Sequence, residues 1–560
     1  MVKNIRNACK ETVNSLKETY FYDEVETMLE NLNAAKSNME ILSGLVKDFA
    51  NAYTKKKQSK NIIDFSDMEH YALQILTREE DGKLVPSPAA KEYQEKFEEV
   101  MIDEYQDSNY VQEAILTSVS SVSNGKYNVF MVGDVKQSIY RFRLARPELF
   151  MGKYHTYSEE DAREQRIDLH KNFRSRREVL ESTNFIFRQI MTMGFGGIEY
   201  DERSALYVGA DYEEKPGNET EVLLIDVSER AEDLTVRETE GLVVAKRIKE
   251  LVGNHLIFDK NTGEYRKAQY GDIVVLTRSV KGWTDVFLRV LNEEGVPAYS
   301  ISKEGYFEAR EIQMLLDYLR VLDNPRQDIP FTAVLTSTFA GVSTEELAMI
   351  KSEMQGKTFY DCTLSYIDSG ANASLKEKLL HFIQQLELFR KKVPYTAIHN
   401  LLWDILEQTG FGNYIAALPA GEQRTANVEM LIEKAISFES TSYKGLFHFV
   451  RYIEQLKKYD VDYGEANIQD ESSNVVGLMS IHKSKGLEFP IVIVAGMEKK
   501  FNLKDAGGSV VLHSELGAGI DFVDIESREK SPSLLKRIIQ QEIKKESVAE
   551  ELRILYVAMT

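Results

Sequence analysis

A set of short apolar segments, each running into polar residues, constrains the fold of this chain more than any other feature. Two of them lie at residues 99–103 and 128–133 and lead into Asp-Glu and Gly-Asp. Similar segments lie at 222–227, 273–277, 476–481 and 491–495. Short strands that alternate with helical stretches predict a parallel sheet, because a parallel connection needs a crossover helix. The sequence therefore predicts an α/β fold.

Helical periodicity dominates three other parts of the chain. Residues 1–60 repeat apolar side chains at three- to four-residue spacing, and residues 331–470 do so without strong strand signals. We interpret the second stretch as a helical insertion into an α/β domain. The tail predicts a further helix, with Ser531 as its N-cap and Pro532 at its first position.

Length and composition limit the class of protein. The 560 residues are enough for three or four domains, and 69 basic against 89 acidic side chains give a net charge of −20. Cys9 and Cys362 are too few and too far apart in sequence for a disulfide scaffold or a CxxC metal site. No apolar run reaches the roughly eighteen residues of a membrane span, so we expect a cytoplasmic protein without a membrane partner. The acidic charge does not exclude nucleic acid, because a local groove can carry the opposite sign.

The strongest chemical signal lies at the end of the first apolar segment. Asp103 and Glu104 follow it directly, as in the Walker B arrangement of nucleotide hydrolases. A parallel strand delivers such side chains to the carboxyl edge of its sheet, where ligands bind. Asp103 can hold Mg²⁺, and Glu104 can orient or deprotonate an attacking water. The alternative is an acidic pair that ends a strand and solvates a turn.

The segment after the second strand mixes aromatic rings with basic side chains. Gln137 could read a terminal phosphate or a water, and Tyr140, Phe142 and Arg143 interleave rings with a guanidinium group. Bases of single-stranded nucleic acid stack on rings, and its phosphates pair with arginine. The alternative is a core aromatic with solvated arginines.

Two further segments supply donors for phosphates. Arg174 could stabilise charge that develops on a γ-phosphate. His482, Lys483 and Lys485 surround Gly486 with imidazole and ammonium donors. A lone arginine or histidine is more often structural, so these segments gain weight only in combination.

In this order, the segments resemble the UvrD/Rep-like superfamily 1 helicases, and among them the AddA family of bacterial AddAB helicase–nucleases. The resemblance covers essentially the whole chain and rests on DFSDMEHYALQIL (64–76), DEYQD (103–107), VGDVKQSIYRFRLARPELF (132–150), HKNFRSRREVL (170–180), LMSIHKSKGLEFPIVIVAG (478–496) and AEELRILYVAMT (549–560). It implies two RecA-like P-loop NTPase lobes, each a parallel sheet flanked by helices, with helical insertions. The implied cofactors are ATP and Mg²⁺. The implied partners are single- and double-stranded DNA and an AddB-like protein in a heterodimer.

The resemblance also implies a role for each matching residue. Asp103 would assist Mg²⁺ binding, Glu104 would activate water, and Gln137 would sense the γ-phosphate. Arg174 would be an arginine finger. The other nucleotide contacts would come from Phe173 on adenine, Glu488 on ribose, and Gly486. The DNA contacts would come from Phe65, Tyr140, Phe142, Arg143, His482 and Lys483.

The implied domains follow the same alignment of motifs. Residues 1–60 would end helical insertion 1B, 61–165 would form part of lobe 1A, 331–470 would be helical insertion 2B, and 166–330 with 471–560 would form lobe 2A.

The match departs from the family at both ends. No GxxxxGK[ST] phosphate loop occurs in the sequence. Gly356-Lys357-Thr358 is a decoy, because position 351 is Lys and residues 346–354 predict a helix. The chain stops at Thr560, where the family continues with Arg-Ala and later a nuclease domain. We therefore expect an incomplete motor fragment with little or no ATPase of its own.

Three functions remain open from the sequence. The first is an ATP-dependent 3′→5′ DNA helicase or translocase of the AddAB type, acting in double-strand break repair and recombination. The second is a motor-dead DNA-binding or scaffolding protein, which the absent phosphate loop favours and the intact Asp103, Glu104, Gln137 and Arg174 disfavour. The third is a nuclease-free UvrD-type repair helicase.

Overall fold

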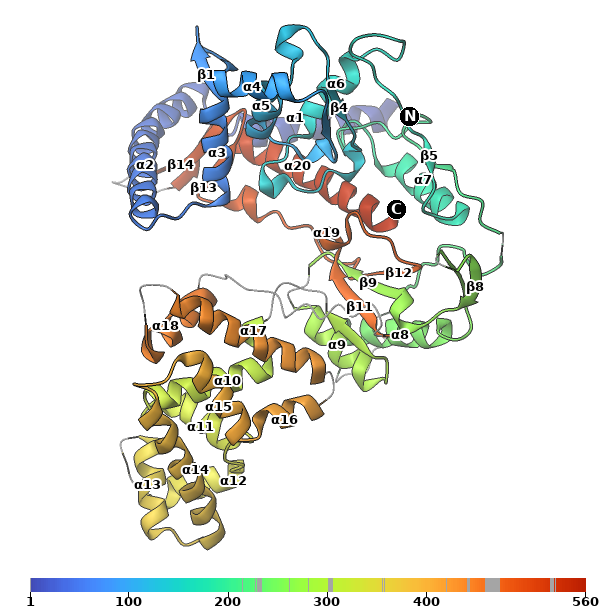
Figure 1. Ribbon diagram of the computed structural model, residues 1–560. Coiled ribbons are helices and arrows are strands. Elements are labelled where there is room, and N and C mark those ends of the chain that lie inside the picture. Colours follow the sequence, from blue (N-terminus) through green and yellow to red (C-terminus); the bar gives the residue numbers. More distant parts are fainter. Residues whose placement is uncertain are drawn as a thin grey trace. The chain divides into compact units, whose positions relative to one another are not determined.

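The computed structural model describes residues 2–213, 215–226, 228, 234–260, 262–279, 282–300, 306–354, 356, 358–418, 421–440, 444–458, 474–523, 528 and 530–560 (Figure 1). The chain divides into two compact units. The first unit comprises Met1–Ile225, Ile481–Glu488 and Gly496–Thr560, and the second comprises Asp226–Ser480 and Phe489–Ala495.

The first unit combines helices with several small sheets. Its helices are α1 (Val2–Tyr20), α2 (Val25–Ser59), α3 (Phe65–Leu76), α4 (Pro88–Lys96), α5 (Tyr110–Val119), α6 (Pro147–Thr156), α7 (Arg177–Ile190), α19 (Ile481–Ser484) and α20 (Leu534–Met559). Its strands are β1 (Thr77–Glu80), β2 (Lys83–Pro86), β3 (Val100–Ile102), β4 (Val129–Met131), β5 (Lys171–Asn172), β6 (Tyr207–Val208), β13 (Val510–His513), β14 (Gly517–Val523) and β15 (Lys530–Pro532). The strands β3 and β4 pair in parallel, with Val100 opposite Val129. Short 3₁₀ turns follow them, η1 (Tyr105–Asp107) after β3, and η3 (Val135–Gln137) after β4.

The long helix α20 holds the first unit together. Its Ile539 and Ile543 are buried with Val511 of β13. Near its end, the Tyr556 ring meets the ring of Phe187 on α7, with ring centroids 5.2 Å apart. Burial of apolar and aromatic side chains along one helix therefore joins segments from both ends of the chain.

The second unit joins an α/β part to a helical part. The α/β part contains α8 (Val236–Leu251), β7 (Leu256–Asp259), β8 (Glu264–Lys267), β9 (Ile273–Thr277), α9 (Thr284–Glu293), β10 (Ala298–Ser300), β11 (Val476–Ser480) and β12 (Ile491–Ala495). Four of these strands form a parallel sheet in the order β10-β11-β9-β12. The helical part contains α10 (Arg310–Asp323), α11 (Asp328–Thr336), α12 (Thr344–Glu353), α13 (Phe359–Ser369), α14 (Ala373–Lys392), α15 (Ile398–Gln408), α16 (Phe411–Ala417), α17 (Gly421–Glu439) and α18 (Leu446–Lys458).

Each part of the second unit has its own core. All five residues of β9 are buried, and Ile248 of α8 and Phe287 of α9 pack in the same cluster. A parallel strand covered on both faces reads as a continuous apolar run, and Ile-Val-Val-Leu-Thr has that character. The helices α10 to α18 share a second, larger cluster of buried aromatic and aliphatic side chains.

Most predicted elements are confirmed. The strands predicted at 99–103, 128–133, 273–277, 476–481 and 491–495 correspond to β3, β4, β9, β11 and β12. The described residues between 331 and 458 form helices and no strand, while 459–470 lie outside the described residues. The decoy is also resolved at its two described positions, since the segment before it is helix α12 and Thr358 caps α13.

Two predictions are wrong. Residues 222–226 form no strand, because their apolar side chains find no partner strand and Val222 and Leu224 stay exposed; residue 227 lies outside the described residues. The last helix begins at Leu534 with Ser533 as its N-cap, not Ser531. The Ser533 hydroxyl accepts from Lys536 N and donates to Ile520 O, whereas Pro532 belongs to β15.

The two compact units do not follow the predicted domain ranges. Residues 166–225 and 496–560, both predicted in lobe 2A, belong to the first unit together with residues 61–165. The assignment to two lobes and two insertions stays a prediction.

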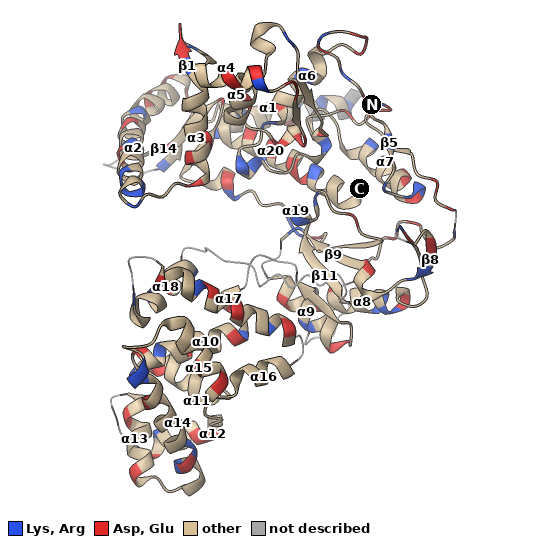
Figure 2. Cartoon of the chain, viewed as in Figure 1, with Lys and Arg blue, Asp and Glu red and all other residues tan. Residues whose placement is uncertain are grey.

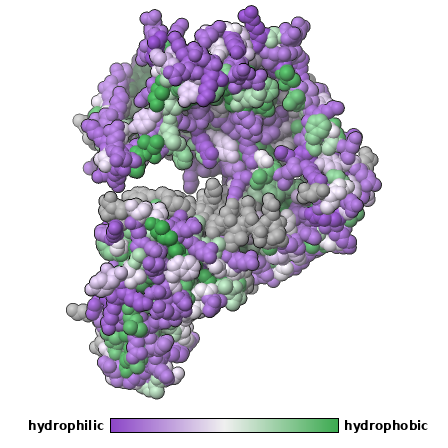
Figure 3. Space-filling view, in the orientation of Figure 1, coloured by the Kyte–Doolittle hydropathy of each residue, from purple (hydrophilic) through white to green (hydrophobic). Residues whose placement is uncertain are grey.

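The surface gives no sign of a membrane span. Among the described helices, none is long and apolar enough to cross a bilayer. Basic and acidic side chains are interspersed over both units (Figure 2). The face seen in Figure 3 is largely hydrophilic, with small scattered hydrophobic patches.

Candidate functional site

The carboxyl end of β3 presents two exposed carboxylates. Asp103 and Glu104 follow the strand at once, and Glu104 N donates to Asp103 Oδ1 at 2.8 Å. Glu104 has φ +50° and ψ +40°, a left-handed conformation that costs a non-glycine residue about 1–2 kcal/mol. Asp107 N, which donates to Glu104 O at 2.9 Å, closes the turn. The surrounding structure therefore fixes the backbone beneath these two carboxylates.

Gln106 connects this turn to the turn after β4. It is fully buried; its Nε2 donates to the Glu104 carboxylate, and its Oε1 accepts from Asp134 N at 2.9 Å. The neighbouring Gly133 is required by space, because a Cβ there would lie 2.3 Å from Gln106 Oε1. The amide thus fixes the relative position of the two strand ends.

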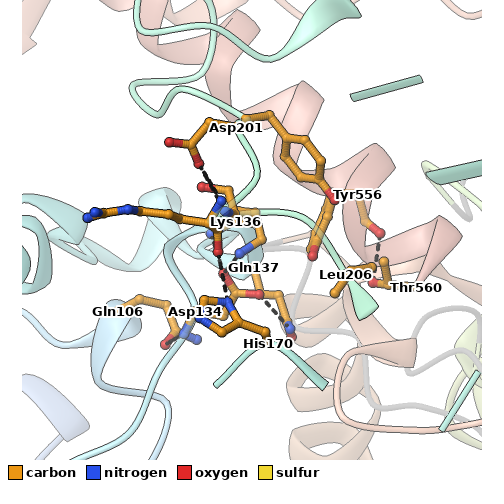
Figure 4. A network of polar contacts seen from close by, with 12 residues as sticks. Gln106, Asp134, Lys136, Gln137, His170, Asp201, Leu206, Tyr556 and Thr560 are labelled. Carbon is orange, nitrogen blue, oxygen red and sulfur yellow. Dashed lines mark hydrogen bonds and ion pairs between the residues drawn. The ribbon is translucent and has the colours of Figure 1, made fainter. Parts of the chain in front are cut away.

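Gln137 joins the same network through Asp134. Gln137 Nε2 donates to Asp134 Oδ2 at 3.1 Å, and Lys136 Nζ pairs with Asp134 Oδ1 at 2.9 Å. Figure 4 shows Gln106, Lys136 and Gln137 gathered around Asp134, with Tyr556 beside Lys136. The predicted hydrolysis residue Glu104 and the predicted phosphate sensor Gln137 are therefore parts of one hydrogen-bonded network.

The predicted DNA-binding aromatics form a cluster. The Tyr140 and Phe142 ring centroids lie 5.9 Å apart, and the His482 ring lies 6.3 Å from the first and 5.7 Å from the second. The Arg143 guanidinium carbon lies 5.1 Å from the Tyr140 ring and 5.6 Å from the Phe142 ring. The structure thus brings together rings and a cation suited to stacked bases and phosphates.

Lys485 is placed differently from the sequence-based expectation of a phosphate donor. Its side chain is 5% exposed, pairs with Asp107, and lies 3.3 Å from Glu104 Oε2. Its ammonium also lies 5.0 Å from the centroid of the Tyr140 ring. Burial raises the pKa of Asp107, and the hydrogen bond from Lys485 opposes that rise.

The predicted nucleotide-contact residues form a third group. Arg174 Nε pairs with Glu488 Oε2 at 3.0 Å, and Arg174 N donates to Asn172 Oδ1 at 2.9 Å. Phe173 is exposed, and its ring lies so close to Gly209 that a Cβ there would be 2.9 Å away. A left-handed φ of +80° at Gly486 turns the chain between α19 and Glu488.

Phe65 lies apart from these groups. It is the first residue of α3, is 85% exposed, and follows Asp64, whose side chain caps the helix. Lys57 Nζ lies 2.8 Å from Asp64 Oδ2 and 2.5 Å from Asp67 Oδ2, and its hydrogen bond lowers the pKa of Asp64. Among the described residues, no contact joins Phe65 to the other predicted site residues, so its DNA role stays a prediction.

Sequence reasoning missed several residues that hold the site. Arg141 pairs with Glu546 of α20, and its backbone N–H donates to Glu550 Oε1 at 3.2 Å. Arg553 is buried, which lowers its pKa, and donates to Ser138 O at 2.7 Å. Those partners are more than 400 residues apart in sequence, so no local pattern could reveal them.

The carboxylates fit a magnesium ion held mostly by a nucleotide. Mg²⁺ in nucleotide sites takes one or two protein carboxylates together with phosphates and waters, and the exposed Asp103 and Glu104 can supply these. The described part of the chain contains no group of three or more His, Cys, Asp or Glu side chains that could hold a metal alone.

Comparison with known proteins places the chain in a family. Residues 3–158 match the UvrD/REP helicase N-terminal domain, and residues 167–560 match the UvrD-like helicase C-terminal domain. The chain therefore belongs to the UvrD-like helicases, which have an α/β P-loop helicase fold.

Individual relatives sharpen the family. The chain is 43% identical to the AddA-type ATP-dependent helicase/nuclease of Lachnoclostridium phytofermentans, over 100% of this chain and 46% of that protein. The same-named proteins of Alkaliphilus metalliredigens and Acetivibrio thermocellus are 45% and 41% identical, over 100% of this chain and 46% and 48% of theirs. The predicted resemblance to AddA proteins is confirmed. The chain spans about half the length of these curated relatives.

Proposed function

We propose that this chain belongs to the motor of an ATP-dependent DNA helicase/nuclease, which moves 3′→5′ along one DNA strand. The supporting observation is the hydrogen-bonded network from Glu104 through Gln106 and Asp134 to Gln137, in a chain that matches UvrD-like helicases along its length. The relatives are named as ATP-dependent helicase/nuclease proteins of the AddA type. By the same likeness, we propose an AddB-like partner and work on double-strand breaks in the cytoplasm.

The proposed chemistry assigns one task to each residue. ATP with Mg²⁺ supplies the phosphoryl group whose transfer to water releases free energy. Asp103 holds the metal, and Glu104 accepts the proton of the attacking water, while Gln106 keeps that carboxylate oriented. Gln137 donates its amide to the terminal phosphate, and Arg174 stabilises the negative charge that develops there.

The remaining site residues bind the nucleotide and the DNA strand. Phe173, Gly486 and Glu488 form the rest of the nucleotide contact. Tyr140 and Phe142 stack on bases. The strand backbone is contacted by Arg143, His482 and Lys483, with Phe65 at a more distant contact. We propose two RecA-like lobes as the scaffold, with insertions at the ranges given by the motifs.

Strand displacement tests the proposal on the protein as its gene encodes it. We expect ATP hydrolysis stimulated by single-stranded DNA, and unwinding of a duplex with a 3′ tail but not of one with a 5′ tail. Unwinding from the 5′ tail would contradict the proposed direction.

A motor-dead DNA-binding protein is the second candidate, because the sequence contains no GxxxxGK[ST] loop. It predicts binding of single-stranded DNA with no hydrolysis of ATP under any DNA condition. Nucleotide binding measured by calorimetry on the same protein would separate the two candidates.

A further inference from the structure

Lys485 occupies the junction between the two halves of the proposed site. Its ammonium contacts Asp107 and lies 3.3 Å from Glu104 Oε2, the carboxylate proposed for hydrolysis. The same ammonium lies 5.0 Å from the ring centroid of Tyr140, which is proposed to stack on a DNA base. A cation at this distance from a ring face is attracted to it. Lys485 is therefore in contact with both the hydrolysis turn and the DNA-binding cluster.

The charges around Lys485 make it the principal counter-charge of the η1 turn. Asp107 Oδ1 is buried and has no hydrogen-bond partner among the described residues. Glu104 adds a second negative charge, while Arg143 contributes a weaker positive influence on Asp107. The rings of Tyr140 and His482 complete the surroundings. Without Lys485, a buried carboxylate would be left uncompensated.

We propose that Lys485 is a positioning residue that couples DNA binding to hydrolysis: it holds Glu104 and Asp107 while resting on the ring of Tyr140. A base stacked on Tyr140 changes the surroundings of the ammonium and thereby its hold on Glu104. The inference rests on the proposed function and identifies the side chain through which its two halves communicate. It also assigns Lys485 to the carboxylates and not to DNA phosphates.

The coupling is measured as the ratio of ATP hydrolysis with and without a saturating oligo(dT), in the protein as its gene encodes it. In Lys485→Met, we expect this ratio to fall by about tenfold or more, the size of a typical coupling between two sites. Lys485→Arg, which keeps the charge, should retain at least about half of the ratio. An unchanged ratio in Lys485→Met, or an equal loss of hydrolysis with and without DNA, would overturn the proposal.

Lys536 provides a matched control. Its side chain is also 5% exposed, and its ammonium pairs with Asp521 at 2.7 Å, away from the proposed site. Lys536→Met therefore also breaks a buried ion pair. We expect it to lower the melting temperature, as Lys485→Met does, but to leave the stimulation ratio unchanged. A comparable loss of the ratio in Lys536→Met would reduce the Lys485 effect to general destabilisation and overturn the proposal.

The salt dependence of DNA binding separates coupling from direct contact. Removal of a phosphate contact lowers the slope of log affinity against log salt by about one. We expect this change for Lys483→Met and no change for Lys485→Met. A reduced slope in Lys485→Met would make Lys485 a DNA contact and overturn the proposal.

A double variant covers the case in which Lys485→Met does not fold. Lys485→Met with Asp107→Asn removes both charges, so no buried carboxylate is left unpaired. We expect this protein to fold and still show the lowered ratio, and a wild-type ratio would overturn the proposal. Absence of stimulated hydrolysis in the wild-type protein would instead refute the proposed function and the inference with it.

Discussion

The two parallel sheets of this protein differ in how they are covered. In the second unit, β9 is buried at all five positions and paired on both sides, with β11 and β12 as neighbours. In the first unit, β3 and β4 pair only with each other, and their central residues Met101 and Phe130 are 69% and 56% exposed. Parallel strands are usually covered on both faces, so the first pair departs from the common pattern.

The difference separates stability from chemistry. The β9 sheet has apolar side chains on both faces and gains its stability from burial. The β3–β4 pair buries less, but its carboxyl ends carry the network of Glu104, Gln106, Asp134 and Gln137. Substitutions in the two sheets should therefore affect different measurable quantities.

Glu104→Gln should give the largest effect, and it should appear only in activity. Loss of a general base lowers turnover by about 10²–10⁴-fold. The exposed side chain contributes little to packing, so the melting temperature and the affinities for ATP and DNA should stay unchanged. Steady-state hydrolysis with calorimetric binding of both ligands checks this, and retained hydrolysis would contradict the role of Glu104.

Phe287→Ala should destabilise the second unit without touching the proposed site. The ring is fully buried in the core that contains β9, so its removal should cost about 3–5 kcal/mol. Urea unfolding combined with hydrogen exchange of the β9 amides measures the loss. A change below about 1 kcal/mol would show that this sheet is not the more stable of the two.

Gln106→Leu should affect both quantities, because Gln106 is a buried part of the active network. Its loss leaves Asp134 N without its acceptor, at a cost of about 1–3 kcal/mol, and should also slow hydrolysis. Gln94→Leu is the matched control, since Gln94 is buried in the same unit and donates to Ser118 O at 2.7 Å. The control should lose stability alone, and equal activity in the two variants would contradict the network.

Phe142→Ala should weaken binding of single-stranded DNA by about 1–3 kcal/mol, the range for one aromatic stacked on a base. The ring is exposed, so stability should not change. Fluorescence anisotropy with a labelled oligonucleotide provides the measurement. Phe185→Ala, which removes another exposed ring of the first unit, should leave the affinity unaltered.

Phe130→Ala should give the smallest effect. The side chain is more than half exposed, and substitutions at such positions usually change stability by less than about 0.5 kcal/mol. A loss comparable to that of Phe287→Ala in chemical denaturation would show that something covers the β3–β4 face in solution.

Local sequence patterns predicted the strands well when burial matched composition. The apolar runs of β3 and β9 each end at a polar residue, and both strands lie where the pattern puts them. Residues 222–226 carry a similar pattern but remain exposed, because strand formation depends on a neighbour that local sequence does not specify.

The candidate site was predictable in its parts but not in its connections. Tyr140, Phe142 and His482 form the expected cluster. The pairing of Lys485 with Asp107 spans 378 residues, and an ammonium group is equally suited to a phosphate or a carboxylate. Only the fold decides between these partners.

The position of α20 has a consequence for how the chain acquires its structure during synthesis. Tyr22 Oη donates to Pro532 O, a contact between residues 510 positions apart, and Arg553 bonds Ser138 across 415 positions. The second unit is drawn almost wholly from one uninterrupted stretch, Asp226–Ser480. On the ribosome, most of that stretch can therefore settle early, while the first unit waits for its final helix to emerge. During that interval, the apolar surfaces that α20 later covers are available to chaperones.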